Sequence, residues 1–512
     1  MKSRSNPHSA QVGAIEEIAP DPNLRRVEFV GTATSHFQAE PLLTYSLESS
    51  RVHSDWELEL ARRLGGQSCG IPNAEISNLP RFLYRKEQYI RRSRELSQNM
   101  FRFSLDFARL CPDKGQFSEE LMTEYIKVLA LIRTSGQEPF LTLHHFTMPR
   151  SLIQTDPYGN LISGAWENRD IIQHFRFYIR NVVRFLTDEL LIRRILSQLK
   201  INGTEADRII SEGTVRYFMT INEPTAVLYN GYVSGIFPPY RKASLRKACS
   251  VLEKLVEAHD LAFDEIKRGL QMLRYEPQVG LGYSWPYFDG AVGTIAQEIQ
   301  DYCTRRFERT GNRSDFLGIH YYFRRTIPLG SRKRLHRDYS DQPTFGDIYP
   351  VGVLDVLREA HAQYPAKDIF VSEIGFSDKT DLRRPFWILE TVQHLLREAE
   401  SNTPIKGVLL WSLVDNFEWD LGMSQKFGLF NEADLAKPLS QSSNGIRSWE
   451  AWRAATRAIL SPSSESLREL QRCYTVAYAQ YREAGGKYER KMDDTHLRFA
   501  PDGPDKEATS HG

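Results

Sequence analysis

Cysteine, net charge and long apolar segments are all scarce in this chain of 512 residues. Its cysteines are odd in number and form no Cys-x-x-Cys pair; they are Cys69, Cys111, Cys249, Cys303 and Cys473. This pattern argues against a disulfide framework or a thiolate zinc site and favours a reducing, cytoplasmic location. The 66 basic and 65 acidic residues leave a net charge of +1, so the chain has no general electrostatic reason to bind nucleic acid.

The lack of long apolar segments bears on membranes and on the chain ends. No run of about 18 apolar residues occurs, so no transmembrane helix is expected. The opening residues lack the apolar core of a signal peptide, and residues 1–23 are expected to be a flexible arm. Residues 461–512 are expected to be a polar extension with one helix near Ser466–Ala484 and disorder from Asp493 onward. One domain is expected between them, over residues 24–460.

Within that domain, eight short apolar runs recur, and most are followed by an amphipathic stretch. Their length, their aromatic and β-branched residues and their flanking turns are typical of buried parallel strands. The predicted strands are Arg26–Ala33, Met100–Leu105, Pro139–His144, Val215–Ile221, Val279–Tyr283, Phe316–Tyr321, Ile369–Ser372 and Gly407–Trp411.

The stretches between these runs have the periodicity of helices. In Ser118–Thr134 the apolar residues fall on one helix face, and Gly136 follows as a stop signal. Ile171–Leu186 and Val251–Ile266 show the same pattern. Strands that alternate with helices in this way predict an α/β fold, a (β/α)₈ TIM barrel with long loops after its strands. A doubly wound sheet is the second choice, because no glycine-rich phosphate turn follows the first run.

In such a barrel, functional side chains lie at the carboxyl ends of the strands. Polar or aromatic side chains end or follow every predicted strand. They are Gln38; Arg102; His144 and His145; Asn222 and Glu223; Tyr283 and Trp285; His320 and Tyr322; Glu373; and Trp411 with Asp415, Asn416, Glu418 and Trp419. Two of them, Glu223 and Glu373, are glutamates that would face each other across the barrel mouth.

Two facing carboxyl groups among aromatic and hydrogen-bonding side chains are what glycoside hydrolysis needs. One must hold a proton while the other is ionised, and Arg102 would favour the ionised form of its neighbour. Each feature alone has a plainer explanation: a helix start at Asn222, a first-turn charge at Glu373, an ion-pair partner in Arg102, and core packing for the tryptophans. The hypothesis depends on their combination. No metal site is expected at His144 and His145, because adjacent strand residues point to opposite faces.

Several motifs strengthen this interpretation. The most specific are Thr220-Ile221-Asn222-Glu223-Pro224 and the run from Trp411 to Trp419, and they are accompanied by Phe29–Gln38, Phe101–Ser104, Thr142–Phe146 and Ser424–Leu429. Together, from about Phe29 to Trp452, they resemble glycoside hydrolase family 1, the retaining β-glycosidases.

The resemblance implies a (β/α)₈ barrel in which Glu223 is the general acid/base and Glu373 the nucleophile. Asn222 would bind the 2-hydroxyl group of the sugar, while Arg102 and Tyr322 would hold Glu373. The remaining implied sugar-binding residues are Gln38, His145, Trp411, Glu418, Trp419 and Phe427. The implied partner is a small glycoside, and neither a metal nor an organic cofactor is implied.

Two further expectations follow from the retaining mechanism. The carboxyl groups of Glu223 and Glu373 should lie roughly 5–5.5 Å apart, not the ~6.5–9.5 Å of inverting enzymes. The negative charge of Glu373 should raise the pKa of Glu223, so that Glu223 is protonated in the free enzyme.

Four positions depart from the family pattern. Ile374 follows the nucleophile, His320 replaces the usual Asn, and Thr225 and Phe107 each replace a Trp. The stretch Gly375–Pro385 resembles the plant galactolipid galactosyltransferases, a transferring branch of the family.

Three functions therefore stay open: a hydrolase of β-glucosides or β-galactosides, a transglycosylase with a sugar or lipid acceptor, and a sugar-binding protein with impaired chemistry. A phospho-sugar hydrolase ranks below them, because Glu418 would repel a 6-phosphate despite Lys426 nearby. The glycone, the aglycone and the oligomeric state are also open.

Overall fold

The computed structural model describes residues 27–41, 54–59, 80–289, 291–308, 313–326, 348–400, 403–440 and 445–487. The expected arm at residues 1–23 and the expected disorder after Asp493 lie outside these residues. Within the described part of the chain, no helix is long and apolar enough to cross a membrane.

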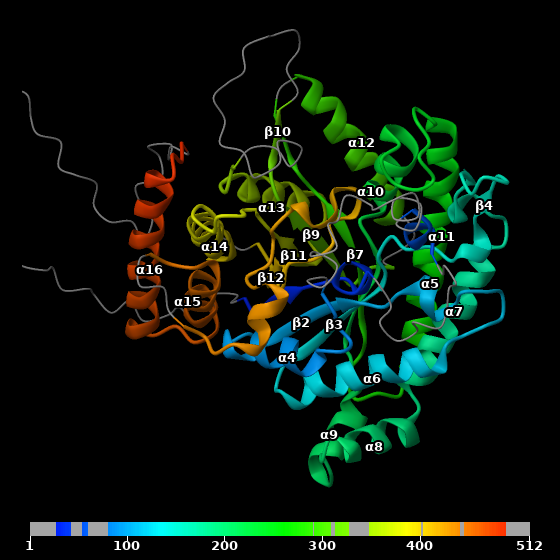
Figure 1. The fold of residues 1–512 in the computed structure, drawn as a ribbon, viewed down its shortest axis with the longest axis horizontal. Helices are drawn as coiled ribbons and strands as arrows, with labels where there is room; N and C mark the ends of the chain where they lie inside the picture. The colour runs from blue at the N-terminus through cyan, green and yellow to red at the C-terminus, as the bar shows by residue number, and fades with distance from the viewer. Residues whose placement is uncertain are drawn as a thin grey trace, which may run out of the picture.

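The centre of the molecule is a closed barrel of eight parallel strands (Figure 1). The strands are β1 (Phe29–Ala33), β2 (Met100–Ser104), β3 (Glu138–His144), β6 (Tyr217–Asn222), β7 (Gln278–Ser284), β9 (Phe316–Tyr321), β11 (Asp368–Ile374) and β12 (Ile405–Trp411). They pair in chain order, and β12 closes the barrel against β1. Each of the eight predicted apolar runs overlaps one of these strands, so the predicted (β/α)₈ fold is confirmed.

Helices surround the barrel and follow the predicted alternation. They are α4 (Lys86–Glu95), α6 (Glu119–Thr134), α7 (Ile171–Leu186), α11 (Leu245–Gly269), α12 (Ala291–Glu308), α13 (Gly352–Gln363), α14 (Arg384–Glu400) and α15 (Ser448–Leu460). The predicted helix over Ser118–Thr134 is confirmed as α6, and the Ser118 hydroxyl accepts a hydrogen bond from Leu121 N at its start. The other two predicted helices are α7 and the central part of α11.

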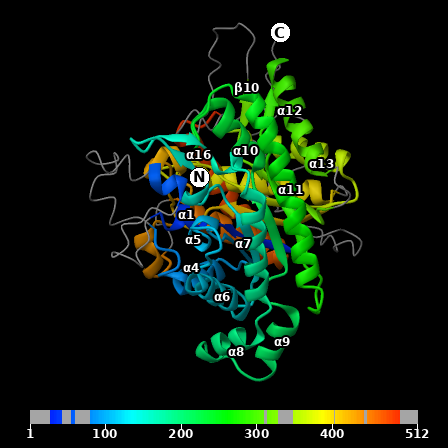
Figure 2. The same cartoon turned by 90° about the vertical axis from the view of Figure 1, so that its right-hand side faces the viewer.

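Additional elements decorate the two ends of the barrel. Helices α8 (Glu189–Gln198) and α9 (Thr204–Glu212) project from the amino ends of the strands (Figure 2). At the carboxyl ends lie the short helices α1 (His36–Ala39), α5 (Phe107–Leu110) and α10 (Pro224–Leu228), and two small sheets, β4 (Gln154–Thr155) with β5 (Leu161–Ser163) and β8 (Tyr287–Asp289) with β10 (Arg324–Thr326).

An aromatic layer fills the barrel interior below the mouth. The rings of Phe140, Phe316 and Phe370 are buried, and the centroid of Phe370 lies 5.3 Å from Phe140 and 5.0 Å from Phe316. The guanidinium carbon of Arg102 lies 5.9 Å from the centroid of the Phe140 ring. Because these rings are buried and apolar, the guanidinium of Arg102 lies against an apolar layer of the barrel interior.

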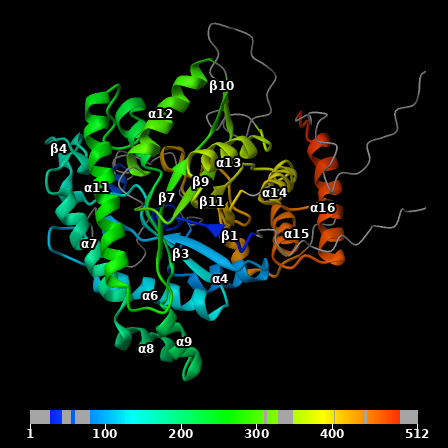
Figure 3. The ribbon, with the colours of Figure 1, turned by 180° about the vertical axis from the view of Figure 1, so that it is seen from behind.

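The last described helix, α16 (Ser464–Glu483), packs on the outside of α14 and α15 (Figure 3). It overlaps the helix predicted near Ser466–Ala484. Tyr481 is fully buried and its ring stacks on Phe386 of α14 at 4.4 Å, while the Tyr474 hydroxyl donates to Glu390 at 2.6 Å. The boundary expected at residue 460 thus falls between two helices that contact each other.

Candidate active site

The predicted site residues gather at the carboxyl ends of the strands, as a barrel of this kind requires. Glu373 lies near the end of β11, and its side chain is 4% exposed. Both of its oxygens accept hydrogen bonds: Oε1 from Arg102 Nη1 at 2.6 Å, and Oε2 from the Tyr322 hydroxyl at 2.5 Å. A cation and a phenol thus stabilise the ionised form of this carboxylate.

Arg102 connects the strands beneath the site. Besides Glu373, its guanidinium donates to Asn222 Oδ1 at 2.5 Å, to Thr142 Oγ1 at 2.9 Å and to the Ser372 carbonyl at 3.1 Å. A buried arginine that is paired in this way can act only as a fixed charge. From β2, this one side chain thus bonds to residues of β3, β6 and β11.

Glu223 directly follows β6 and has left-handed backbone angles, φ 42° and ψ 63°. The next residue, Pro224, begins α10, so the chain turns sharply at the glutamate. Its Oε1 lies 2.8 Å from His320 Nδ1. A non-glycine residue in the left-handed region is strained, and such strain is concentrated at functional sites.

Burial raises the pKa of Glu223 to about 7, and the charge of Arg102 partly offsets this shift. The expected direction is confirmed, but the expected cause is wrong. Removal from water is the main cause, not repulsion by Glu373. The hydrogen-bond partner of the glutamate is a neutral imidazole, and among the described residues no cation bonds to it.

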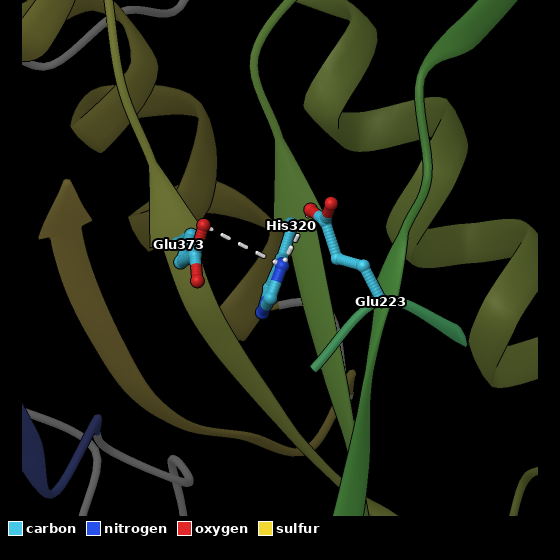
Figure 4. A group of neighbouring side chains, drawn as sticks. All are labelled: Glu223, His320 and Glu373. Carbon is cyan, nitrogen blue, oxygen red and sulfur yellow. Dashed lines mark hydrogen bonds and ion pairs between the residues drawn. The ribbon is translucent and has the colours of Figure 1, made fainter. Parts of the chain in front are cut away.

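His320 lies between the two carboxyl groups (Figure 4). Its Nδ1 is 2.8 Å from Glu223 and 3.5 Å from Glu373 Oε2, and its side chain is fully buried. Burial lowers the pKa of His320 to about 3, with Glu373 opposing and Arg102 reinforcing the shift. The imidazole is therefore neutral at physiological pH.

The remaining predicted residues form the opposite wall. Gln38 of α1 donates from Nε2 to Glu418 Oε2 at 3.0 Å. Burial raises the pKa of Glu418 to about 8, and the charges of Glu373 and Glu223 add to the shift. A Glu418 carboxyl that is largely protonated at neutral pH can both donate to and accept from a sugar hydroxyl.

Aromatic rings line this wall. The ring of His145 stacks between Trp411, at 5.8 Å, and Trp419, at 5.9 Å. Asn222 Nδ2 lies 3.3 Å from His145 Nε2, which joins the wall to the Arg102 network. Phe427 packs edge-on against Tyr322 at 5.8 Å. Flat apolar faces beside hydrogen-bonding groups suit a sugar ring.

A pocket opens next to Trp419 and is lined mainly by apolar residues, several of them aromatic. Trp56 lies 4.8 Å from Trp419 between ring centroids, and Phe146 and Phe237 complete the contact. Asp55 also lines the pocket, and burial raises its pKa to about 7. Trp56 could not be expected at the site from the sequence, because none of the family motifs covers its segment.

The structure brings all the predicted site residues into one connected set of contacts, although their chemical roles stay predictions. Two contributors were missed. Thr142 was noted only as part of a motif, and it accepts from Arg102. His320 was expected at a strand end and as a departure from the family pattern, but without a role in the site. The signal that could have identified it was its place directly before Tyr321 and Tyr322 at the end of β9.

One oxygen each of Glu223 and Glu373 and one nitrogen of His320 all lie within 4.8 Å of one another. Two carboxylates and an imidazole this close together are ligand types that bind metal ions. However, both oxygens of Glu373 already accept hydrogen bonds, and the Arg102 cation lies in the same cluster. The expectation of no metal cofactor stays a prediction.

Comparison with known proteins agrees with this arrangement. Several solved structures share the fold, including the β-glycosidase of Thermosphaera aggregans (TM-score 0.66, 21% identity, covering 87% of this chain and 98% of that one) and the β-glucosidase of Pyrococcus furiosus (TM-score 0.66, 20% identity, covering 90% and 99%).

Curated relatives have different names. "Beta-glucosidase-like SFR2, chloroplastic" of rice is 25% identical over 400 residues, which is 72% of this chain and 56% of that protein. "Galactolipid galactosyltransferase SFR2, chloroplastic" of Arabidopsis thaliana is 25% identical over 70% of this chain and 55% of its own. The chain thus spans about half the length of these two relatives. A 6-phospho-β-galactosidase of Clostridium acetobutylicum is 22% identical over 78% and 90%.

The family profile described as glycosyl hydrolase family 1 matches residues 29–195 and 312–440, more than half of the sequence. The matched ranges include Arg102, His320, Glu373 and Glu418, and the motif at Asn222–Pro224 falls between them. The resemblance found in the motifs is therefore confirmed at the level of the family: the chain belongs to glycosyl hydrolase family 1.

Proposed function

We propose that this protein is a retaining β-glycosidase that cleaves β-glucosides or β-galactosides through a covalent glycosyl-enzyme intermediate. The observation that carries the proposal is the unequal environment of two neighbouring carboxyl groups. Arg102 and Tyr322 both donate to Glu373, whereas Glu223 is largely withdrawn from water, has no cation bonded to it within the described part of the chain, and has its pKa raised to about 7. The pair is thus divided into an ionised nucleophile and a protonated acid.

In the first step, a Glu373 oxygen attacks the anomeric carbon and the glycosidic bond breaks. The proton of Glu223 passes to the departing oxygen, so the aglycone leaves as a neutral alcohol and Glu223 becomes ionised. In the second step, a water oxygen attacks the same carbon, its proton passes to Glu223, and the ester bond to Glu373 breaks. Two inversions leave the product with the configuration of the substrate.

Sugar recognition is assigned to the wall opposite. Gln38 and Glu418 are hydrogen-bonded to each other, so one hydroxyl group can contact both. Asn222 and His145 would bind hydroxyl groups nearer the reacting carbon, and Trp411, Trp419 and Phe427 would contact the ring. Glucose and galactose differ at one hydroxyl, so the contacts of Gln38 and Glu418 are expected to decide between them.

The second candidate is a retaining transglycosylase, in which a sugar or lipid hydroxyl replaces water in the second step. The similarity to the Arabidopsis galactolipid galactosyltransferase favours it, and so does the stretch Gly375–Pro385. The chemistry of Glu223 and Glu373 is the same for both acceptors. The two activities therefore differ only in whether water or an acceptor hydroxyl attacks the glycosyl-enzyme.

A phospho-sugar hydrolase is the least favoured candidate, although two 6-phospho-β-galactosidases are among the relatives. The argument that Glu418 repels a phosphate is weaker than expected, because its pKa of about 8 leaves it largely uncharged at pH 7. Lys426 could offer a cation to a phosphate, but its Nζ lies 3.6 Å from Asp415 Oδ2 and is already paired with that carboxylate.

The deciding experiment is a screen of nitrophenyl β-glycosides that differ only in the sugar, with product analysis by NMR. Release of the β-anomer supports the retaining mechanism, and the α-anomer as first product contradicts it. Each reaction is repeated with added glycerol, cellobiose or galactolipid, and transfer products that exceed the free sugar identify a transglycosylase. Absence of turnover on every sugar would leave the sugar-binding hypothesis.

The cellular location stays a prediction. The cytoplasmic location expected from the cysteines is not tested by the structure, and two of the plant relatives are named as chloroplastic. A small glycoside is the proposed partner.

A further inference from the structure

His320 occupies a position between the two carboxyl groups where the family usually has asparagine. It lies near the end of β9, in register with Ser284 of β7 on one side and Glu373 of β11 on the other. Its carbonyl accepts from Trp285 N at 2.9 Å, so the backbone is held on the β7 side. The side chain therefore points into the barrel mouth from a strand fixed by both neighbours.

A glycine makes room for the imidazole. A Cβ atom placed on Gly282 of β7 would lie 2.8 Å from His320 Nε2, well inside van der Waals contact. The same atom would lie 2.6 Å from Met219 Sδ. His320 Nε2 is thus enclosed by β7 and Met219, and it has no hydrogen-bond partner among the residues that the structure describes.

The two ring nitrogens consequently have different environments. A neutral imidazole carries one N–H, and a buried N–H without an acceptor is costly. With the proton on Nε2, that N–H would have no acceptor in its enclosed site. With the proton on Nδ1, it points at Glu223 Oε1 at 2.8 Å. The Nδ1–H tautomer is therefore favoured, and burial keeps the ring neutral by lowering the pKa of His320 to about 3.

A donor at Oε1 determines where the acidic proton of Glu223 resides. If Oε1 accepts the hydrogen bond from Nδ1–H, the carboxyl proton must lie on Oε2, which has no protein partner among the described residues. The same N–H bond also stabilises the carboxylate left after the proton has been transferred. One donor can thus serve both half-reactions without itself titrating.

We propose that His320 is a positioning residue for the acid/base step, a hydrogen-bond donor that orients the Glu223 carboxyl, confines its transferable proton to Oε2 and stabilises the ionised form that activates the acceptor. The inference rests on the proposed function of Glu223. At this position the chain has an imidazole N–H donor in place of the asparagine amide that the family usually has.

The other charged and titratable groups around this contact are accounted for. From β11, Glu373 lies 3.5 Å from Nδ1 and has its own donors in Arg102 and Tyr322. Glu418 lies on the far wall and bonds to Gln38. The pKa of His145 is held well below its usual range by burial, with the charge of Arg102 adding to the shift, so it is neutral as well. His320 is thus a donor that bonds to Glu223 without carrying a charge.

The test compares His320→Leu and His320→Asn with the wild type on two aryl β-glycosides, one with a dinitrophenolate leaving group and one with a poor alkyl leaving group. His320→Leu removes the donor. It should lower kcat/KM for the poor leaving group about 100-fold and for dinitrophenolate only a few-fold, because that leaving group needs little protonation. The alkaline limb of kcat/KM should move up by about one pH unit, because the ionised form of Glu223 has lost its donor.

His320→Asn keeps an N–H donor and should restore most of both effects. The matched control is His174→Asn on α7, a buried histidine that bonds to the Cys111 carbonyl and lies outside the site. It should leave the ratio between the two substrates and the pH profile unchanged. Equal losses on both substrates in His320→Leu, with an unmoved alkaline limb, would show a merely structural role and overturn the proposal.

A second measurement needs neither activity nor a stable Leu variant. In ¹⁵N-histidine-labelled wild type, the imidazole signals of His320 are assigned by their absence in His320→Asn. A one-bond proton coupling on Nδ1 is expected, and a coupling on Nε2 would overturn the proposal. If the wild type cleaves no glycoside, the proposed function fails, while this tautomer measurement still decides the hydrogen bond.

Discussion

Glu223 and Glu373 approach each other from β6 and β11, although β7 and β9 separate these strands in the barrel. One oxygen of each lies within 4.8 Å of the other. An oxygen–oxygen distance of at most 4.8 Å is compatible with the roughly 5–5.5 Å of retaining enzymes and is shorter than the ~6.5–9.5 Å of inverting ones. The curvature of the barrel, not proximity in the sequence, creates the pair.

Glu373 is expected to carry the covalent intermediate. Glu373→Ala should reduce turnover by several orders of magnitude, and azide should restore the formation of an α-linked product. A 2-fluoro sugar followed by peptide mapping should label Glu373 in the wild type. The exposed Glu120→Ala on α6 is the control and should keep full activity. A label on any other residue would contradict the assignment.

Glu223 should set the alkaline limb of the pH profile. Its pKa is raised to about 7, so the acid form predominates below pH 7 and is lost as the pH rises through that value. The kcat/KM for a poor leaving group should therefore fall above about pH 7. In Glu223→Gln the alkaline limb should vanish, and poor leaving groups should suffer far more than dinitrophenolate. An equal loss for both in the glycosylation step would show that Glu223 is not the acid.

Glu418 should lower stability at high pH. An unfolded glutamate titrates near ~4.3, whereas the folded pKa is about 8. Folding thus favours the protonated form, and its contribution is fully present below ~4.3 and is lost as the pH rises through 8. Glu418→Gln should raise the free energy of unfolding at pH 9 by on the order of 5 kcal/mol, with little change at pH 4. Urea unfolding at both pH values measures this, and no difference between them would contradict the burial argument.

Helix α16 should be part of the stable unit. Tyr481→Ala removes a fully buried ring that stacks on Phe386, and it should cost about 3–5 kcal/mol of unfolding free energy. Leu467→Ala on the same helix is the control, because Leu467 is 37% exposed, and it should change stability by less than about 0.5 kcal/mol. A single cooperative transition that shifts in Tyr481→Ala supports one unit, whereas unchanged stability would indicate a separate extension.

Catalysis should need no metal ion. Activity after dialysis against EDTA should equal the activity before it, because the proposed steps use only Glu223, Glu373 and water. Loss of activity that is restored by one divalent metal would assign the trio of Glu223, His320 and Glu373 to a metal site.

The fold could be predicted because each strand is short, apolar and flanked by turns. The boundaries were less certain. The first strand was expected from Arg26, which lies outside the described residues, and it begins at Phe29. Glu28 is exposed, although its N–H still donates to the Lys406 carbonyl at 3.0 Å. The positions of Glu223 and Glu373 followed from the strand ends. The cause of the raised Glu223 pKa could not be predicted, because the burial of a side chain depends on every neighbouring element and no local sequence pattern encodes it.

The contact between Gly282 and His320 also constrains how this site can change by mutation. Any side chain at 282 would collide with the imidazole, whereas glycine there is compatible with a smaller residue at 320. The two positions are therefore epistatic. A lineage could acquire the histidine only after the glycine, and reversing the glycine first would disrupt the site before the histidine could be replaced.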